Sequence, residues 1–557
     1  MAKPTRFTQE MMDEYLARGY WVKESIADLW DRNAQMIPDK EALIDSRGRL
    51  SWADVKHRSD NIALELLRTG YKRDEIIFVL LPNCSDSYFF RIACEKAGIL
   101  SMTGLMTIRE TEIEYVLSTF GVKGIAIPRR FRNFDYHAAV VEMQSRLPAL
   151  RDIFVIWDDV PSGTHSVDEM ARRQPAVDYP PALLAHTRFP ATEVVTIGLT
   201  SGTTGVPKTA EHMPAARIAT GTTYQRSVRL TADDVVLNVI NAVAGRGGAF
   251  CYSQPRIGAK TVCLEKWNPA EACKLIQSER ATIMLLAPAQ LAMLVRHPDF
   301  NNYDLSSLRC LACSTAPLSE ELIIEAESKL KAPVLNSYGM FDGGGVSGTT
   351  IDDDAETRHK TMGKPYAGIE IRIVDDDGND VPPGHDGELM FRGPYTTAGF
   401  FRDLPRTLEA WGELGKNGWF HSGDIGRMDS SGNILLTGRK KDLFKRGGQA
   451  VYPAEIEDLL HTHPKVAQAA VVAMPDPVMG EKGCAYIVVN DGESFSFEEM
   501  KAFLYGKKIA SYKIPERLEL IDELPMKNFK VLKAALREDI AAKLRFESNT
   551  CRDQVGG

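Results

Sequence analysis

A short apolar run that ends in a glycine-rich loop is the feature that most limits how this chain can fold. Val194–Leu199 has the continuous apolar character of a buried strand, and Thr200–Thr209 (T-S-G-T-T-G-V-P-K-T) follows it directly. Glycines let backbone N–H groups approach an anion, hydroxyls add donors, and Lys208 adds a positive charge. Pro207 before the lysine excludes a Walker A loop. The stretch therefore suits a polyphosphate, although composition alone leaves a flexible polar loop as an alternative.

Apolar runs alternate with helical periodicity along much of the chain. Glu75–Leu81, which ends at Pro82, predicts a strand buried on both faces, and Ser87–Ala97 predicts a helix after it. The alternation predicts α/β layers with largely parallel sheets, and the loop at Thr200 would then lie at the carboxyl end of its strand, where ligands bind. Further buried strands are expected at Ala42–Asp45, Ala281–Leu286, Leu308–Ala312 and Val334–Asn336.

The pattern changes after Pro365, where short alternating strands separated by Asp/Gly turns predict a smaller β-rich subdomain. We expect a large N-terminal domain over residues 1–437, with two α/β sheets and this subdomain, and a small, mobile α+β C-terminal domain over residues 438–557. Strands of the subdomain are expected at Ile369–Val374, Glu388–Arg392 and Ile434–Leu436. The C-terminal domain should hold helices at Pro453–His461, Phe497–Tyr505 and Lys533–Leu544, strands at Ala469–Met474 and Ala485–Val489, and a loose tail beyond Arg545.

The composition is that of an ordinary soluble globular enzyme. Of 557 residues, 44% are hydrophobic and 25% charged, and 67 basic against 75 acidic residues give a net charge of −8, which favours neither a nucleic-acid nor a polybasic membrane partner. No apolar run is long enough to span a bilayer. Nine scattered cysteines fit a reducing compartment, so a cytoplasmic location is expected. Cys310 and Cys313, in an apolar run, predict a buried strand and not a redox pair.

The ten-residue loop resembles the phosphate-binding loop of the adenylate-forming (ANL) superfamily, which includes acyl-CoA synthetases, peptide-synthetase adenylation domains and luciferases. Four later stretches are similar to motifs of this family in order and spacing, so the likeness covers essentially the whole chain. They are Gly387–Leu389 with Arg392–Pro394, Gly418–Asp424, Gly438–Asp442 with Gly447, Gly448 and Tyr452–Glu457, and Phe529–Lys533. The opening from Gly19 to Asp45 leans toward the branch that takes aryl and alicyclic acids.

The resemblance implies an acyl-CoA ligase that uses ATP, Mg²⁺ and coenzyme A. A carboxylic acid would first be joined to AMP with loss of pyrophosphate, and the CoA thiol would then attack the acyl-adenylate; positioned cations and N–H donors should dominate the first step. The phosphates of ATP would be held by Thr200, Ser201, Gly202, Thr203, Thr204, Gly205 and Lys208. The adenine would lie against Tyr338 and near Ser314, Thr315, Ala316 and Pro317, with Gly339, Met340, Phe341 and Asp342 completing the nucleotide site.

Further roles follow from the same resemblance. Asp424 would accept hydrogen bonds from the ribose, Arg439 would add a ribose or phosphate contact, and Lys530 would reach the α-phosphate and the acyl carboxylate. Taken singly, Asp424 is typical of a turn residue, and Arg439 and Lys530 are typical of solvated surface charges. Lys441 would be the hinge of a domain rotation that removes Lys530. Lys445, Gly447 and Gly448 would line the path of CoA, and Asn241, Gly245, Gly247 and Gly343 the acid pocket. The apolar surroundings of that pocket favour a bulky hydrophobic acid.

Two stretches depart from the family's pattern. The family usually has Tyr-Gly-x-Thr-Glu where this chain has Tyr338–Asp342, so Phe341 cannot donate to phosphate and Asp342, the expected Mg²⁺ ligand, is one methylene shorter. The loop that leads to Lys530 is one residue shorter and carries Phe529 in place of glycine. Asn241 also stands near a position where many relatives carry histidine.

These departures bear on adenylation and leave the thioester-forming parts intact. The ordinary two-step ligase is the more frequent kind in the family. The losses add the hypothesis that the adenylation half-reaction is weak or lost, and that the chain acts chiefly on an acyl-adenylate from an upstream adenylating enzyme. Three other classes stay open: an adenylating enzyme that loads a carrier protein, a non-catalytic binding module and a luciferase-like oxidase.

Overall fold

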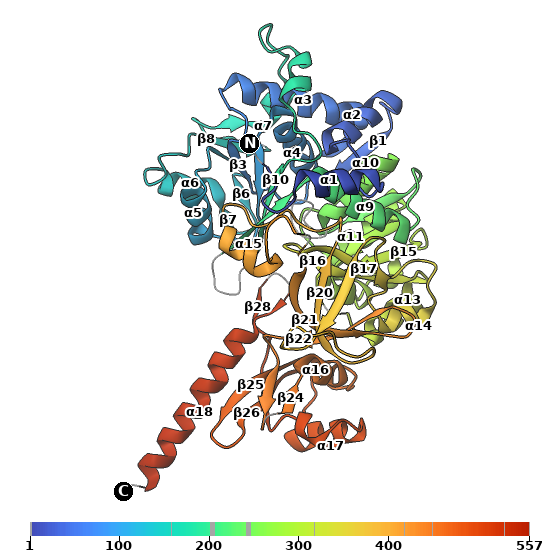
Figure 1. Ribbon diagram of the computed structural model, residues 1–557, viewed down its shortest axis with the longest axis vertical. Coiled ribbons are helices and arrows are strands. Elements are labelled where there is room, and N and C mark those ends of the chain that lie inside the picture. Colours follow the sequence, from blue (N-terminus) through green and yellow to red (C-terminus); the bar gives the residue numbers. More distant parts are fainter. Residues whose placement is uncertain are drawn as a thin grey trace. The chain divides into compact units, whose positions relative to one another are not determined.

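The computed structural model describes residues 3–157, 159–200, 207–240, 247–316, 318–416, 418–447, 449–527 and 530–555. The chain divides into two compact units (Figure 1). The first comprises Met1–Leu318, Leu322–Glu370 and Phe391–Phe420, and the second Ser319–Glu321, Ile371–Met390 and His421–Gly557. The boundary expected at residue 437 and the hinge at Lys441 stay predictions.

The first unit contains a nine-stranded sheet in which six consecutive strands, β16 to β1, are parallel to one another and β2, β17 and β18 are antiparallel to their neighbours. Its order is β18 (Lys364–Pro365), β17 (Gly344–Gly348), β16 (Val334–Met340), β15 (Cys310–Cys313), β14 (Ile283–Leu286), β12 (Val235–Asn238), β13 (Lys260–Cys263), β1 (Glu41–Asp45) and β2 (Gly48–Ser51). Cys310 and Cys313 are buried in separate core clusters, as expected for a structural strand.

A seven-stranded sheet of the same unit carries the expected phosphate loop. It is parallel except for its edge strand β11. Its order is β11 (Lys208–His212), β10 (Thr196–Thr200), β4 (Leu100–Thr103), β3 (Ile76–Val79), β5 (Gly124–Pro128), β8 (Asp152–Ile156) and β9 (His165–Ser166). All four residues of β3 are buried, which confirms the expected strand with two covered faces. A short ribbon pairs β6 (Arg130–Phe131) with β7 (Phe134–Asp135).

Helices cover both sheets, and several begin where the sequence provides an N-cap. Ser25 and Ser51 each form a capping box with an aspartate three residues later. The helices are α1 (Gln9–Ala17), α2 (Ile26–Met36), α3 (Trp52–Arg68), α4 (Ser85–Ala97), α5 (Glu110–Thr119), α6 (Tyr136–Gln144), α7 (Val167–Arg172), α8 (Leu184–Thr187), α9 (Pro214–Ser227), α10 (Gly247–Ile257), α11 (Pro269–Glu279), α12 (Pro288–Val295), α13 (Glu320–Leu330), α14 (Ala355–Lys360) and α15 (Leu404–Trp411).

The second unit is built on two smaller sheets. A four-stranded sheet has the order β19 (Glu370–Val374), β20 (Gly387–Arg392), β21 (Phe420–Met428) and β22 (Ile434–Arg439), which confirms the alternating strands of a β-rich subdomain. Most of this sheet belongs to the second unit, whereas the subdomain was predicted from the sequence as part of the N-terminal domain. A five-stranded sheet has the order β24 (Gln449–Val451), β23 (Phe444–Arg446), β26 (Gly480–Val489) and β25 (Val466–Asp476), with β27 (Arg517–Leu520) also paired to β26.

Helices pack on both faces of the five-stranded sheet (Figure 1). One face carries α16 (Pro453–His461) and α17 (Phe497–Gly506), the other α18 (Lys533–Val555). Leu536 and Ile540 of α18 are buried against that second face. The prediction of a loose tail beyond Arg545 was wrong, because α18 continues to Val555. Among the described residues no helix combines the length and apolarity that crossing a membrane requires.

Candidate nucleotide site

The hairpin of β10 and β11 brings the expected phosphate loop to the end of a sheet. Its antiparallel register pairs Thr200 with Lys208 and Gly198 with Ala210. Residues Ser201, Gly202, Thr203, Thr204 and Gly205, which the sequence places in the loop, lie outside the described residues.

Lys208 and Asp342 form an ion pair, with Nζ 3.0 Å from Oδ2. The two residues are 134 positions apart, and the sequence predicted each independently for the nucleotide site. The lysine side chain is 36% exposed and the aspartate 15%, so the pair lies at an accessible surface. A polyphosphate could therefore be reached by the lysine, and a metal ion by the carboxylate.

A third segment, Thr396–Phe401, fixes the position of this pair. The hydroxyl of Thr397 donates to the main-chain oxygen of Asp342 at 2.7 Å, and the Phe401 N–H donates to the carbonyl of Thr209 at 2.7 Å. Lys208 Nζ lies 5.6 Å from the centre of the Phe400 ring. Sequence reasoning missed this support, since no motif or spacing connects residues so far apart in the chain.

The expected adenine side is formed by the ends of β15 and β16. Tyr338 is buried in β16, and Ser314 follows β15 with a buried Oγ that has no hydrogen-bond partner among the described residues. Thr315 has φ of +86°, a rare conformation for a β-branched residue and one found most often at functional sites. An orphaned hydroxyl beside a strained backbone fits a site that a polar ligand completes. Ala316 is described, whereas Pro317 lies outside the described residues.

The ring of Phe341 faces the interior of the first unit. Its centre is 4.6 Å from that of His212, and its edge packs directly over the Cα of Gly198. Gly339 and Met340 precede it at the end of β16. Phe341 therefore provides packing where the family's threonine would provide a donor.

In the second unit, Asp424 and Arg439 lie opposite each other on β21 and β22. Arg439 Nε is 2.7 Å from Asp424 Oδ1; the aspartate side chain is 6% exposed and the arginine 46%. Because Asp424 is inside a nine-residue strand, the interpretation as a turn residue was wrong. The guanidinium holds a nearly buried carboxylate and still exposes donors, which also argues against a simple surface charge.

A charged cluster lies beside that pair and includes Glu388, which was noted in the sequence only within a family motif and was given no role. Lys440 is 3.2 Å from Glu388 and 3.1 Å from Asp376, and the Lys440 N–H donates to the carbonyl of Gly423. A hydrogen bond from His421, aided by Lys440 and the Gly423 N–H, lowers the pKa of Glu388 to about 2 against the opposing effect of burial. The cluster fixes the residue next to the expected hinge, and the exposed Lys441 follows in a turn.

The remaining expected residues of the second unit are described in part. Lys530 begins β29 (Lys530–Val531), which pairs with β28 (Met526–Lys527) so that its backbone lies opposite Lys527. Phe529 and Gly448 lie outside the described residues. Lys445 is exposed on β23, and Gly447, at φ of +55°, donates its N–H to the carbonyl of Met479 at 2.9 Å.

The expected acid pocket is only partly described, because Asn241 and Gly245 lie outside the described residues. Gly247 begins α10. Gly343 is closely packed: a Cβ there would lie 2.7–2.9 Å from side-chain atoms of Met340, Phe420 and Phe391. The role of these residues in binding an acid stays a prediction.

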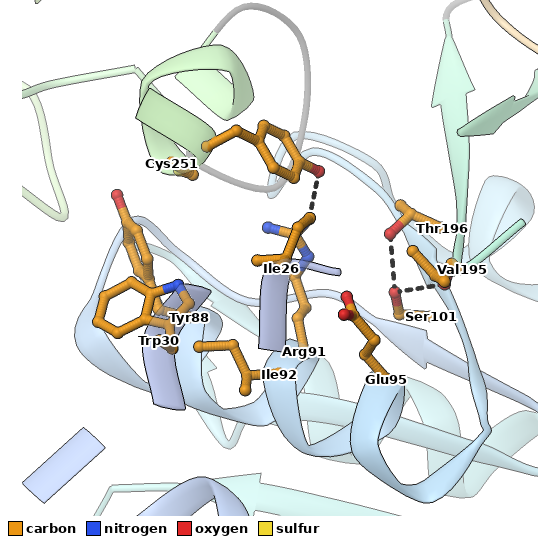
Figure 2. A pocket seen from close by; sticks show the side chains of 11 residues that line it. Ile26, Trp30, Tyr88, Arg91, Ile92, Glu95, Ser101, Val195, Thr196 and Cys251 are labelled. Atoms are coloured by element: carbon orange, nitrogen blue, oxygen red, sulfur yellow. Dashed lines mark hydrogen bonds between the residues drawn. The ribbon is translucent and has the colours of Figure 1, made fainter. Parts of the chain in front are cut away.

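A separate small cavity lies between α2, α4, β4, β10 and α10 (Figure 2). Arg91 donates to the hydroxyl of Tyr252 at 3.1 Å on one side, and Ser101 contacts Thr196 at 3.2 Å on the other. Its volume of about 20 Å³ is room for about one water molecule. It is thus too small to bind a bulky acid.

Metal binding at the expected phosphate site would depend on Asp342 together with the nucleotide. Within the described part of the chain, no group of three or more His, Cys, Asp or Glu side chains could hold a metal ion. Mg²⁺ is often bound by one or two protein carboxylates together with substrate phosphates and water, and Asp342 supplies one such carboxylate.

Comparisons with known proteins agree with this geometry. The sequence profile of AMP-binding enzymes matches residues 30–401, and that of the AMP-binding enzyme C-terminal domain matches residues 455–528. The chain is 31% identical to a medium-chain fatty-acid–CoA ligase of Escherichia coli (strain K12) over 97% of this chain and 94% of the relative. It is 31% identical to a salicylyl-CoA synthase / salicylate adenylyltransferase of Streptomyces sp. over 96% and 97% of the two chains. The fold is similar to that of the anthranilate CoA ligase AuaEII in complex with anthranoyl-AMP, with a TM-score of 0.84 and 22% identity over 94% of this chain and 98% of that one.

Proposed function

Since the chain belongs to the family of AMP-binding enzymes and is an acid–thiol ligase of the AMP-forming type, we propose that it makes the CoA thioester of a bulky hydrophobic carboxylic acid through an acyl-adenylate. An aryl acid fits best, because one relative is named for salicylate and the acid-pocket stretch of this chain is apolar and rich in small residues.

The observation that carries this proposal is the ion pair between Lys208 and Asp342. It unites the end of the phosphate-loop hairpin with the stretch that follows Tyr338. ATP supplies the activated phosphorus; Lys208 would neutralise its outer phosphates, Asp342 would hold the accompanying Mg²⁺, and Ser314 would contribute its orphaned hydroxyl. Asp424 would accept from the ribose, with Arg439 as its charged partner.

The second half-reaction would use other residues. Gly447 and Lys445 would line the CoA path, where the absence of a side chain at Gly447 permits close approach. Lys530 would serve adenylation, and a rotation about Lys441 would exchange the two arrangements.

We further propose that adenylation is the weaker half-reaction. Phe341 places its ring against His212 in the interior and offers phosphate no hydroxyl, and Asp342 is a short carboxylate already paired with a lysine. An enzyme of this kind would act chiefly on an acyl-adenylate made elsewhere, so its partner would be an adenylating enzyme upstream.

Two assays on the purified protein separate the half-reactions. Acid-dependent ATP–pyrophosphate exchange measures adenylation alone, and synthetic acyl-adenylate with CoA measures thioester formation alone. We expect thioester formation to exceed exchange for aryl acids. Robust exchange by the wild type would identify an ordinary two-step ligase, and silence in both assays across the acid panel would contradict the proposed activity.

A variant tests why adenylation would be weaker than thioester formation. Asp342→Glu combined with Phe529→Gly should raise exchange by about tenfold or more, because it returns the longer carboxylate and the flexible lysine loop. Asp352→Glu, at an exposed ion pair of the same unit, is the matched control and should change nothing. If exchange stays unchanged in the combined variant, the departures do not limit adenylation.

A second candidate is an adenylating enzyme that loads a carrier protein. One relative is named both as a CoA synthase and as an adenylyltransferase, and another as a 2,3-dihydroxybenzoate–AMP ligase, so relatives are named for adenylation without a stated thiol acceptor. Competition between free CoA and a holo-carrier for one acyl-adenylate decides between them: product on CoA supports the ligase, and exclusive product on the carrier supports the alternative.

A further inference from the structure

Phe341 and Gly198 are matched in shape. A Cβ built on Gly198 would lie 2.1 Å from Phe341 Cε1 and 2.3 Å from Cζ, far inside van der Waals contact. The obstructing atoms belong to a rigid ring and not to the end of a flexible side chain. Any residue other than glycine at position 198 would displace the ring, the strand or both.

The ring also packs against His212, the last residue of β11, whose Nε2 lies near the same Gly198. His212 is 3% exposed, and its ring is tilted 46° to that of Phe341. Burial, followed by the positive charges of Arg217 and Arg91, lowers the pKa of His212 well below 6.5, so the imidazole is neutral. Its Nε2 has no hydrogen-bond partner among the described residues and faces the aromatic ring and Gly198, an arrangement compatible with a weak N–H to π contact.

Arg217 of α9 connects this packing to the wall of the small cavity. Its guanidinium lies 5.7 Å from the centre of the Phe341 ring and 5.2 Å from that of Tyr252, whose hydroxyl accepts a hydrogen bond from Arg91. The ring therefore has contacts on several sides, which leaves it little freedom to move.

The packed ring lies between the two parts of the candidate phosphate site. Gly198 is two residues before the end of β10, and Phe341 directly precedes Asp342, whose carboxylate meets Lys208. We propose that Phe341, Gly198 and His212 form a wedge in which Phe341 is a positioning residue that sets the Lys208–Asp342 pair for the outer phosphates of ATP. In the wedge, which is defined by these three residues, Phe341 donates no hydrogen bond to phosphate. It contributes instead by fixing the position of the Lys208–Asp342 pair. This inference rests on the proposed nucleotide-binding function.

Comparing ATP with AMP isolates this role, because only ATP carries the phosphates that Lys208 would contact. Calorimetry on the full-length protein gives both affinities without requiring turnover. Phe341→Ala should weaken ATP binding by about tenfold or more and AMP binding by less than about twofold, since misplacement of about 1 Å can cost as much as about 100-fold at such sites. Phe341→Leu, which keeps much of the volume, should restore most of the loss.

A double-mutant cycle tests the match itself. Gly198→Ala should weaken ATP binding strongly in the wild-type background and much less in the Phe341→Ala background, because the Phe341 ring is then gone and only His212 Nε2, 2.9 Å from the added Cβ, still has to shift. Gly124→Ala on β5, a strand of the same sheet as β10, is the control: a Cβ there would lie 2.2 Å from the Tyr71 hydroxyl, so it disturbs packing away from the site. It should lower the melting temperature and leave the ATP-to-AMP affinity ratio unchanged.

The outcomes distinguish a failure of the wedge from a failure of the proposed nucleotide-binding function. Equal losses for ATP and AMP, an unchanged ratio in Phe341→Ala, or an undiminished Gly198→Ala effect without the ring would each overturn the wedge. A wild-type protein that binds neither nucleotide would instead overturn the proposed function. If Gly198→Ala fails to fold, the alanine and leucine variants at position 341 still decide the question.

Discussion

The phosphate side, in the first unit, and the ribose side, in the second unit, are each expected from the sequence and are built by different means. On the ribose side, Asp424 and Arg439 face each other through the register of two adjacent antiparallel strands. On the phosphate side, Lys208 meets Asp342 across 134 residues, with Thr397 and Phe400 from a third segment in support. Two residues held opposite each other by strand register stay opposite in any chain that forms the same strand pair. A contact made by packing of distant segments depends on every side chain that takes part.

That difference coincides with the departures from the expected family pattern. On the ribose side, where one strand pair positions both residues, Asp424 and Arg439 match that pattern. The phosphate side has exchanged a hydroxyl for the ring of Phe341, and Gly198 provides the space for that ring. Where side chains from distant segments pack against one another, a substitution is tolerated when a neighbouring residue changes in size to match it.

Lys208→Met should have the largest effect and should separate the half-reactions. Loss of a positioned cation at developing phosphate charge lowers such rates by about 10²–10³-fold, so pyrophosphate exchange should fall by that factor. Thioester formation from acyl-adenylate should change little, because that substrate has already lost the outer phosphates. Steady-state rates in both assays give the answer; equal losses would mean that Lys208 also serves the second step.

Asp424→Asn should weaken both half-reactions, since ATP and acyl-adenylate carry the same ribose. Loss of a charged hydrogen-bond acceptor costs about 1.5–3 kcal/mol, or roughly 10–150-fold in kcat/KM. Asp386→Asn is the matched control: it breaks the more exposed pair with Arg427 of the same strand at 3.0 Å, which should cost less than about 1 kcal/mol and leave kcat/KM unchanged. An Asp424 variant with full activity would remove it from the ribose site.

Glu388→Gln should reveal a pH-dependent contribution on the ribose side. Because the folded-state pKa is lowered to about 2, the carboxylate stabilises the fold fully above its ordinary pKa near 4.5, and this contribution disappears as the pH falls through about 2. With allowance for solvent screening, the variant should lose about 1–2 kcal/mol at pH 7.

Thermal unfolding of both proteins between pH 7 and pH 2.5 measures that difference, which should shrink at the acid end. Glu356→Gln, at an exposed pair with Lys360, should lose less than about 1 kcal/mol at neutral pH. A constant difference between wild type and Glu388→Gln across the pH range would contradict the assignment.

Elements with a strong local pattern were predictable from the sequence. The apolar run before Pro82, the helix at Pro453 and the alternating strands after Pro365 were found close to their observed bounds, since burial on one or both faces leaves a period in the sequence. Asp424 was predicted as a site residue, and that role stays a prediction. Its Ser-Gly-Asp context was also compatible with a turn, whereas pairing with β22 makes it a strand residue.

Contacts between distant segments were not predictable in this way. Nothing in the stretch around Phe341 indicates that its ring covers Gly198, or that Thr397 holds the next carbonyl. The helical end of α18 was missed for a related reason: its polar composition resembles that of a tail, and helical periodicity is weak there.

Thr315→Gly should give the smallest effect and tests whether the adenine side stores strain. At φ of +86° a threonine is unfavourable by about 1–3 kcal/mol, while glycine in the unfolded chain offsets part of the gain, so a net stabilisation of about 0.5–1 kcal/mol is expected. Lys331→Gly, at φ of +56° on an exposed turn, is the matched control and should stabilise without touching activity. If Thr315→Gly raises the melting temperature and weakens AMP binding, the strain serves to hold the turn beside Tyr338. A rise in melting temperature with unchanged affinity would show that the conformation is tolerated there and not used.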